Sequence, residues 1–154
     1  MGELRIACDA MHGRLARWLR FAGFDASFDP SLSDRSLAGR ARAEGRWLLT
    51  CDRRLAALAG PRVVLLRRAG AAAQIRELRE RLPLTVEPAR FLTRCSRCNG
   101  TLEDVAREAV VDRVPPYVAV HAPRFVACGQ CGWLYWPGTH AGRIARQLEE
   151  WLGR

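Results

Sequence analysis

Four of the six cysteines lie in two Cys-x-x-Cys pairs in the C-terminal third of the chain, a spacing typical of zinc sites. Each pair presents two sulfurs on one side of a turn, and two pairs complete a tetrahedron with Zn–S distances of about 2.3 Å. Gly100 and Gly132 lie just after the two turns, where the tight backbone of a zinc knuckle accommodates glycine. We therefore expect one structural zinc ion with four ligands: Cys95, Cys98, Cys128 and Cys131.

The two pairs are separated by 29 residues, more than the usual ~15–20, which predicts an inserted hairpin. Redox dithiols and an iron–sulfur cluster are the alternatives. A redox Cys-x-x-Cys pair normally lies at a thioredoxin-like strand–helix junction, and neither pair has that setting. His121 and His140 could also bind a metal, although four thiolates already saturate zinc. Cys8 and Cys51 stand in apolar runs, and we interpret both as small buried hydrophobic residues.

Three aspartates form a second group with metal-binding chemistry. Asp9 and Asp52 each follow an apolar strand directly, and ligands of open α/β sheets bind outside the carboxyl ends of the strands. Asp34 stands in the first turn of the helix after Ser33 and can project to the same edge. Crowded carboxylates repel one another unless a cation neutralises them, and oxygen ligands suit Mg²⁺ or Mn²⁺.

Arginines surround these acids in the sequence. A row at three-residue spacing precedes a pair beside Asp52: Arg14, Arg17 and Arg20, then Arg53 and Arg54. Acids that hold a metal ion, set among cations that hold phosphate, are what metal-assisted phosphodiester hydrolysis needs. Local roles remain open: Asp34 can favour the helix dipole, Asp52 can cap a helix, and the arginine row can be a solvated face.

The net charge of +9 comes from 25 basic residues, all arginine. Residues 1–90 hold 17 arginines and 10 acids, whereas residues 91–154 are close to neutral once four thiolates bind zinc. The positive field of the N-terminal part favours nucleic acid or another polyanion.

Strand-like and helix-like segments alternate up to Leu82. Apolar runs predict strands at 4–8, 24–28, 47–50 and 63–66, and helical spacing or capping predicts helices at 15–22, 34–44, 53–59 and 71–81. This alternation predicts an α/β fold, with a parallel sheet flanked by helices.

The pattern stops between Pro83 and Pro88, so we place a domain boundary there and expect domains at 1–82 and 83–154. The second carries short strands, the cysteines and a terminal helix at about 141–152. Without a secretory signal or a long apolar run, a soluble, cytoplasmic protein that does not enter a membrane is the default expectation.

Several runs resemble the Mut-seven C-terminal RNase family, a PIN-like nuclease domain followed by a zinc ribbon. The opening DAMHGRLARWLR, the later LLTCDR and the ribbon motifs RCSRCN, CGQCG and YWPGTH carry the likeness, which covers nearly the whole chain. The resemblance implies a PIN-like α/β fold whose acidic centre, here Asp9, Asp34 and Asp52, binds Mg²⁺ or Mn²⁺ and cuts RNA.

Some positions depart from the family pattern. Cys51 replaces a common arginine, His12 stands where we expect an aliphatic residue, and no acid lies between Asp52 and Glu77. His140 and Trp136 match the family's ribbon, where RNA contact or packing is the expected role.

The resulting hypothesis is a metal-dependent ribonuclease that hydrolyses RNA phosphodiester bonds, with the arginines and His140 binding the nucleic acid. Trp133 and Tyr135 can stack on bases or belong to the core. The alternatives are a non-catalytic RNA- or ribosome-binding module with a structural zinc, and a ribbon that binds another protein.

Overall fold

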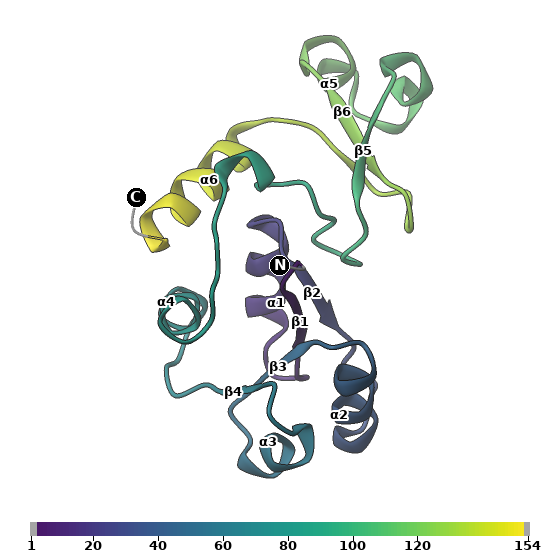
Figure 1. Ribbon diagram of the computed structural model, residues 1–154. Helices are drawn as coiled ribbons and strands as arrows, with labels where there is room; N and C mark the ends of the chain where they lie inside the picture. The colour runs from purple at the N-terminus through teal and green to yellow at the C-terminus, as the bar shows by residue number, and fades with distance from the viewer. Residues whose placement is uncertain (1–2, 153–154) are drawn as a thin grey trace.

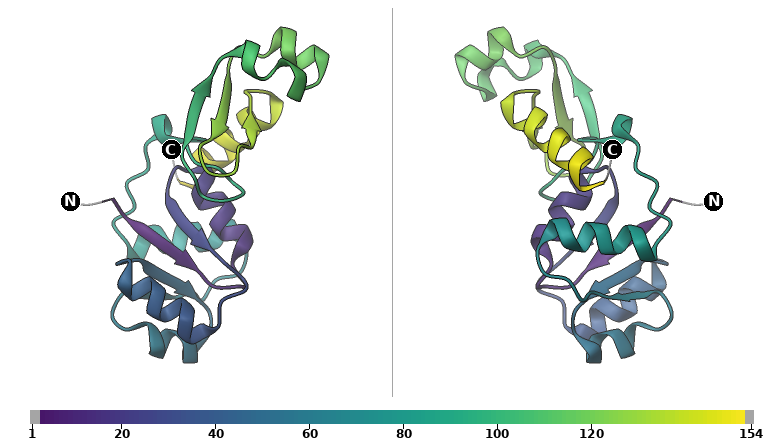
Figure 2. Two further views of the ribbon diagram at one scale, coloured as in Figure 1. Left: turned by 90° about the vertical axis from the view of Figure 1, so that its right-hand side faces the viewer. Right: turned by 90° about the vertical axis from the view of Figure 1, so that its left-hand side faces the viewer.

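The computed structural model describes residues 3–152 and contains two sheets (Figure 1). The larger sheet has four parallel strands in the order β2-β1-β3-β4, and the smaller has three antiparallel strands in the order β5-β6-β7. The smaller sheet and α5 lie at the opposite end of the molecule from α3 (Figures 1 and 2).

The N-terminal half alternates strands with helices, as the sequence predicts. Its elements are β1 (Arg5–Cys8), α1 (Gly13–Phe21), β2 (Asp25–Phe28), α2 (Asp34–Ala43), β3 (Trp47–Thr50), α3 (Arg53–Ala59), β4 (Val63–Leu65) and α4 (Ala71–Arg81). Ser33 begins α2 as expected, because its hydroxyl accepts a hydrogen bond from the Ser36 amide at 3.2 Å.

Successive residues of each strand face opposite layers of helices. On β1, Ile6 and Cys8 pack with α1 and α4, whereas Ala7 packs with α2 and α3. On β3, Leu49 packs in the same cluster as Ile6 and Cys8, and Leu48 packs in the same cluster as Ala7. The sheet is therefore buried on both faces, which explains its continuous apolar runs.

The C-terminal part is built around the antiparallel pair of β5 (Leu102–Val105) and β6 (Phe125–Cys128). Their connection is helical, through η2 (Arg107–Ala109), η3 (Val111–Arg113) and α5 (Pro116–His121). The remaining elements are η1 (Pro88–Arg90), β7 (Leu134–Tyr135) and α6 (Thr139–Trp151). The long spacing between the cysteine pairs is thus a hairpin whose connection forms a small core of its own around Phe125.

Helix α6 returns to the parallel sheet. Leu148 of this helix and Leu152, directly after it, belong to the same buried cluster as Leu19 of α1, and the rings of Trp18 and Trp151 lie 4.4 Å apart. A domain boundary between residues 82 and 83 stays a prediction, and the last helix after it shares the first core.

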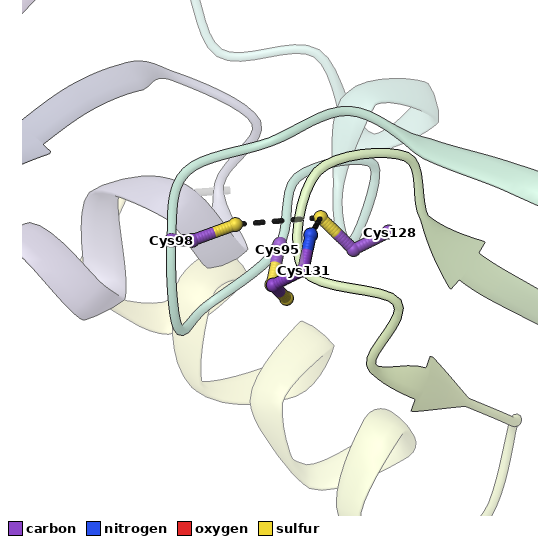
Figure 3. Close-up of side chains that lie close together, drawn as sticks. All are labelled: Cys95, Cys98, Cys128 and Cys131. Carbon is purple, nitrogen blue, oxygen red and sulfur yellow. Dashed lines mark hydrogen bonds between the residues drawn. The ribbon is translucent and has the colours of Figure 1, made fainter.

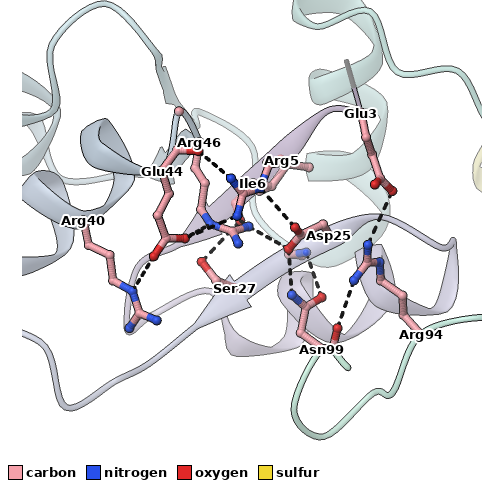
Figure 4. Close-up of polar contacts among 12 residues, drawn as sticks. Glu3, Arg5, Ile6, Asp25, Ser27, Arg40, Glu44, Arg46, Arg94 and Asn99 are labelled. Atoms are coloured by element: carbon pink, nitrogen blue, oxygen red, sulfur yellow. Dashed lines mark hydrogen bonds and ion pairs between the residues drawn. The ribbon is translucent and has the colours of Figure 1, made fainter. Parts of the chain in front are cut away.

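Strand β2 is the outer strand of the parallel sheet, and residues of the first cysteine turn cover its free edge (Figure 4). The Ala26 amide donates to Oδ1 of Asn99 at 2.9 Å, and Nδ2 of Asn99 donates to Oδ1 of Asp25 at 2.7 Å. Nε of Arg20 donates to the Ala26 carbonyl at 2.8 Å. Both backbone groups of Ala26 are thereby satisfied at a sheet edge that would otherwise present them unpaired.

The structure confirms the predicted fold class: a four-stranded parallel sheet flanked by helices, then a small antiparallel sheet with four clustered cysteines and a terminal helix. Across residues 3–152, none of the helices has the length and apolar character that a membrane crossing needs.

We expect Asn99→Gly to lower the free energy of unfolding by about 1–3 kcal/mol, because the Ala26 amide loses its acceptor. Asn99 has a φ of 71°, which glycine adopts without strain, so the lost side chain accounts for the effect. Asn99→Ala should be less stable again by about 1 kcal/mol. Urea unfolding measures both, and a parent-like Asn99→Gly variant would contradict the role of this contact.

Asp25 should make stability depend on pH. Burial raises its pKa, but hydrogen bonds from Arg46 and Asn99 lower it by more, so the pKa lies below its usual value. The stabilisation is fully present above the unfolded pKa of about 3.9 and is lost as pH falls through the folded pKa. Asp25→Asn should therefore be less stable than the parent at pH ~7 and approach it below about pH 4. A difference in urea unfolding that stays constant with pH would contradict this.

Candidate functional site

The four paired cysteines converge on one point (Figure 3). Their sulfurs all lie within 4.8 Å of one another, with Cys95 to Cys131 at 3.7 Å and Cys98 to Cys128 at 3.4 Å. A tetrahedral ion with Zn–S of about 2.3 Å places its sulfurs about 3.8 Å apart. All six cysteines of the chain are free thiols, so the cluster is not a pair of disulfides.

The backbone around the cluster also fits a closed metal site. A Cβ on Gly100 would lie 2.6 Å from Sγ of Cys128, so only glycine lets the first turn approach the second. Gly132 has a φ of 71°, a conformation that favours glycine. The Cys128 sulfur accepts from the amides of Gln130 and Cys131 at 3.4 and 3.5 Å, which is how a knuckle stabilises a thiolate.

The thiols shift one another's protonation. Burial raises the pKa of Cys95, but hydrogen bonds from Tyr135 and backbone amides lower it by more, to about 7. Burial and the neighbouring sulfurs raise the pKa of Cys98 to about 12. A central dication favours the deprotonated form of every ligand, so zinc would overcome this competition. Four sulfurs of this geometry are consistent with structural zinc.

Asp9 lies at the carboxyl end of β1 and is buried. Its Oδ1 accepts from Nδ1 of His12 and from the Met11 amide, and its Oδ2 accepts from the Thr50 hydroxyl at 2.5 Å. Burial raises the pKa of Asp9, but these hydrogen bonds lower it by more, and the net pKa lies below its usual value. The carboxylate is therefore held ionised in one orientation.

Asp52 follows β3, the neighbour of β1 in the sheet, so it lies at the same edge of the sheet as Asp9. The Thr50 hydroxyl that donates to Asp9 also accepts from the Asp52 amide at 2.9 Å, so one side chain joins the two segments. Oδ1 of Asp52 caps α3, accepting from the amides of Arg54 and Leu55 at 2.7 and 3.3 Å. The helix-cap interpretation of Asp52 is thus confirmed.

Asp34 is exposed in the first turn of α2. Among residues 3–152, the cysteines form a group of potential ligands within 4.8 Å of one another, and the three aspartates do not. The structure brings Asp9 and Asp52 to one sheet edge, with Asp34 on a separate helix. Their joint role as metal ligands stays a prediction.

His12 and Thr50 are the contributors to this edge that sequence reasoning missed. Both are buried, and both bind the Asp9 carboxylate. The signal for His12 was its position three residues after Asp9, together with its departure from the family pattern. Thr50 could be found only from the pairing of β1 with β3, which places it opposite Asp9.

Cys8 and Cys51, the two cysteines outside the pairs, were both expected to be buried. Cys8 is buried as expected, but the interpretation of Cys51 as buried is wrong, because the chain leaves the sheet after Thr50 and exposes Cys51.

Glu77 does not join the acidic edge. Its carboxylate accepts from the amides of Arg67 and Arg68 and pairs with Arg81.

The predicted nucleic-acid ligands divide into exposed and buried residues. Those that are exposed lie on α1, at the start of α3 and at the start of α6: Arg14, Arg17, Arg53, Arg54 and His140. Arg20 is only 4% exposed, and its guanidinium donates to the carbonyls of Ala26, Ser96 and Arg97. The prediction of an RNA contact for Arg20 is therefore corrected to a structural role beneath the first cysteine turn.

Two pockets flank that turn, and Arg97 lines both. One, of about 470 Å³, lies between β2, α2 and the cysteines, and its arginines Arg40 and Arg46 are paired with acids. The other, of about 390 Å³, lies between α1 and the small sheet and includes Trp133. Tyr135 is half-buried, whereas Trp133 is 50% exposed and so does not belong to the core.

Comparison with family models matches residues 4–148 to the Mut7-C RNAse domain, which confirms the resemblance seen in the sequence. No curated protein and no solved structure matches the chain.

Purified protein should contain one zinc ion per chain, measurable by elemental analysis. Cys98→Ser should lose that zinc and several kcal/mol of unfolding free energy, because metal binding contributes directly to folding. Cys51→Ser is the matched control: this exposed thiol lies outside the cluster, so zinc content and stability should stay within about 0.5 kcal/mol of the parent. Retention of zinc by Cys98→Ser would contradict the assignment.

Proposed function

Because the chain belongs to the Mut7-C RNase domain family, we propose that it is a metal-dependent ribonuclease that hydrolyses RNA phosphodiester bonds at the carboxyl edge of its parallel sheet. The observation that carries this proposal is that Asp9 and Asp52 follow adjacent parallel strands and that the Thr50 hydroxyl binds both the Asp9 carboxylate and the Asp52 amide. The family supports RNA as the substrate, and the sheet edge supports the position of the chemistry.

The hydrogen bonds of both aspartates leave room for a cation. A carboxylate oxygen offers about two lone-pair sites, and Oδ1 of Asp9 uses both. Oδ2 of Asp9 accepts one hydrogen bond, from Thr50, and within residues 3–152 no donor binds Oδ2 of Asp52. These two oxygens are the proposed ligands for Mg²⁺ or Mn²⁺, with Asp34 as the third carboxylate from α2.

A bound divalent cation supplies an activated water and stabilises the charge that builds on the scissile phosphate. The chain's own residues have different tasks. His12 and Thr50 hold the Asp9 carboxylate ionised and fixed, and the Asp52 cap fixes the start of α3. Arg53 and Arg54, exposed at that start, bind and orient the RNA backbone from beside Asp52.

A second function is a non-catalytic module that docks on RNA or on a ribosomal particle. One observation favours it: Asp9 and Asp52 each have local structural hydrogen bonds, and the three aspartates do not gather within 4.8 Å in the described residues. This alternative keeps salt-sensitive RNA binding but removes any effect of divalent metal or of the aspartates.

Cleavage of RNA with Mg²⁺ or Mn²⁺ tests the nuclease against the module. The double variant Asp9→Asn, Asp52→Asn should lose about 100-fold or more of the activity, since the cation loses both charged ligands. Asparagine still caps helices well, so α3 should persist. Asp104→Asn, an exposed acid on β5, is the control and should cleave like the parent. Equal cleavage by parent and double variant would identify a contaminant and reject the proposed site.

A further inference from the structure

The smaller pocket beside the first cysteine turn carries an exposed aromatic ring that the proposed chemistry does not use. Trp133 is 50% exposed, and the guanidinium carbon of Arg97 lies 4.0 Å from its ring centroid. Arg17, Ser96 and Tyr135 complete the lining of about 390 Å³. This volume falls within the ~300–1,000 Å³ of pockets that hold small molecules.

Both walls of the pocket are fixed by the fold. Arg20 holds the carbonyls of Ser96 and Arg97 at 3.1 and 3.2 Å, and the Tyr135 hydroxyl lies 3.2 Å from the Ser96 hydroxyl. On the other wall, the Trp133 carbonyl accepts from the Cys128 amide at 2.9 Å. A planar group that enters therefore meets walls whose backbone is already ordered, which lowers the entropy cost of binding.

The charge in this pocket is available to a ligand. Arg17 and Arg97 form no ion pair within residues 3–152, and no acid lines the pocket. The larger pocket differs, because its Arg40 and Arg46 are already paired with Glu44. Two guanidinium groups without a carboxylate partner, beside an exposed indole, suit a flat ring with a phosphate on either side.

We propose that the pocket of Arg17, Ser96, Arg97, Trp133 and Tyr135 binds one unpaired nucleotide of the RNA substrate. Because the Arg97 guanidinium already lies 4.0 Å from the Trp133 ring centroid, the base extends this stack from outside and does not enter between the two groups, and the flanking phosphates contact Arg17 and Arg97. Bases in a duplex have both faces covered by their neighbours, so this pocket selects single-stranded RNA. The proposal rests on the ribonuclease function and names its substrate class.

Helix α1 connects the pocket to the proposed cleavage edge. The helix begins at Gly13, close after Asp9, and Arg17 lies about 6 Å further along its axis. Arg14 and Arg17 are three residues apart and share the exposed side of the helix. An RNA strand whose base binds at Trp133 can therefore follow these two arginines toward Asp9.

The test is the affinity of the full chain for a short fluorescein-labelled single-stranded RNA, without added divalent metal, compared with the same strand in a duplex. Trp133→Ala should weaken single-strand binding by about 5- to 150-fold, the loss expected for one stacked base, and should change duplex binding little. Trp133→Phe should restore most of the affinity, and Arg97→Lys, which keeps the charge but loses the planar group, should restore only part of what Arg97→Ala loses.

Tyr117→Ala is the matched control, because it removes an even more exposed ring (73%) on α5, away from this pocket. It should bind like the parent, and equal zinc content in every variant shows that the ribbon remains folded. Parent-like affinity of Trp133→Ala, an equal loss for duplex, or an absence of RNA binding by the parent would each overturn the proposal.

Cleavage with Mg²⁺ separates this proposal from the ribonuclease function. Parent-level cleavage of single-stranded and duplex RNA by Trp133→Ala would reject the pocket and leave the nuclease intact. Selective loss of single-strand binding in Trp133→Ala, with no metal-dependent cleavage by the parent, would support the pocket and reject the nuclease.

Discussion

The edge of strand β2 imposes the constraint that joins the two halves of this protein. A parallel sheet needs partners for the backbone groups of its outer strand, and here side chains supply them on both sides of Ala26. Asn99, which accepts from the Ala26 amide, follows Cys98 directly and has a left-handed conformation with a φ of 71°. The turn that carries two sulfurs of the cysteine cluster therefore also completes the sheet, and this contact joins the two parts.

This connection gives the cysteine cluster an influence beyond its own small sheet. Arg20 links the carbonyls of Ser96 and Arg97 to the Ala26 carbonyl, and α6 packs its leucines into the core beneath α1. The pocket around Trp133 lies at this junction and takes residues from both sides. Metal binding would fix the turn that carries Arg97 and so the proposed RNA-binding wall, without any direct contact between the ion and RNA.

Local patterns in the sequence were sufficient for the elements of the parallel sheet and for the cysteine cluster. Alternation of apolar runs with capped helical segments predicted the parallel sheet, and the Cys-x-x-Cys spacing predicted the cluster. Both patterns can be recognised within short stretches of the sequence. The contacts of Asn99 and Arg20 join positions more than 70 residues apart, and no local pattern encodes them. The same holds for the Thr50–Asp9 bond, which depends on which strands are neighbours.

The arginine row on α1 illustrates why spacing alone misassigned one residue. Steps of three residues turn an α-helix by about 300°, so Arg14 and Arg20 differ in direction by about 120°. Arg14 and Arg17 thus face solvent, while Arg20 turns to the edge of β2 and is buried there. Charge available to RNA is set by such geometry and by pairing, not by the net +9. Within residues 3–152, five arginines around the proposed path of the RNA pair with no acid. They lie on α1, at the start of α3 and at the first cysteine turn: Arg14, Arg17, Arg53, Arg54 and Arg97.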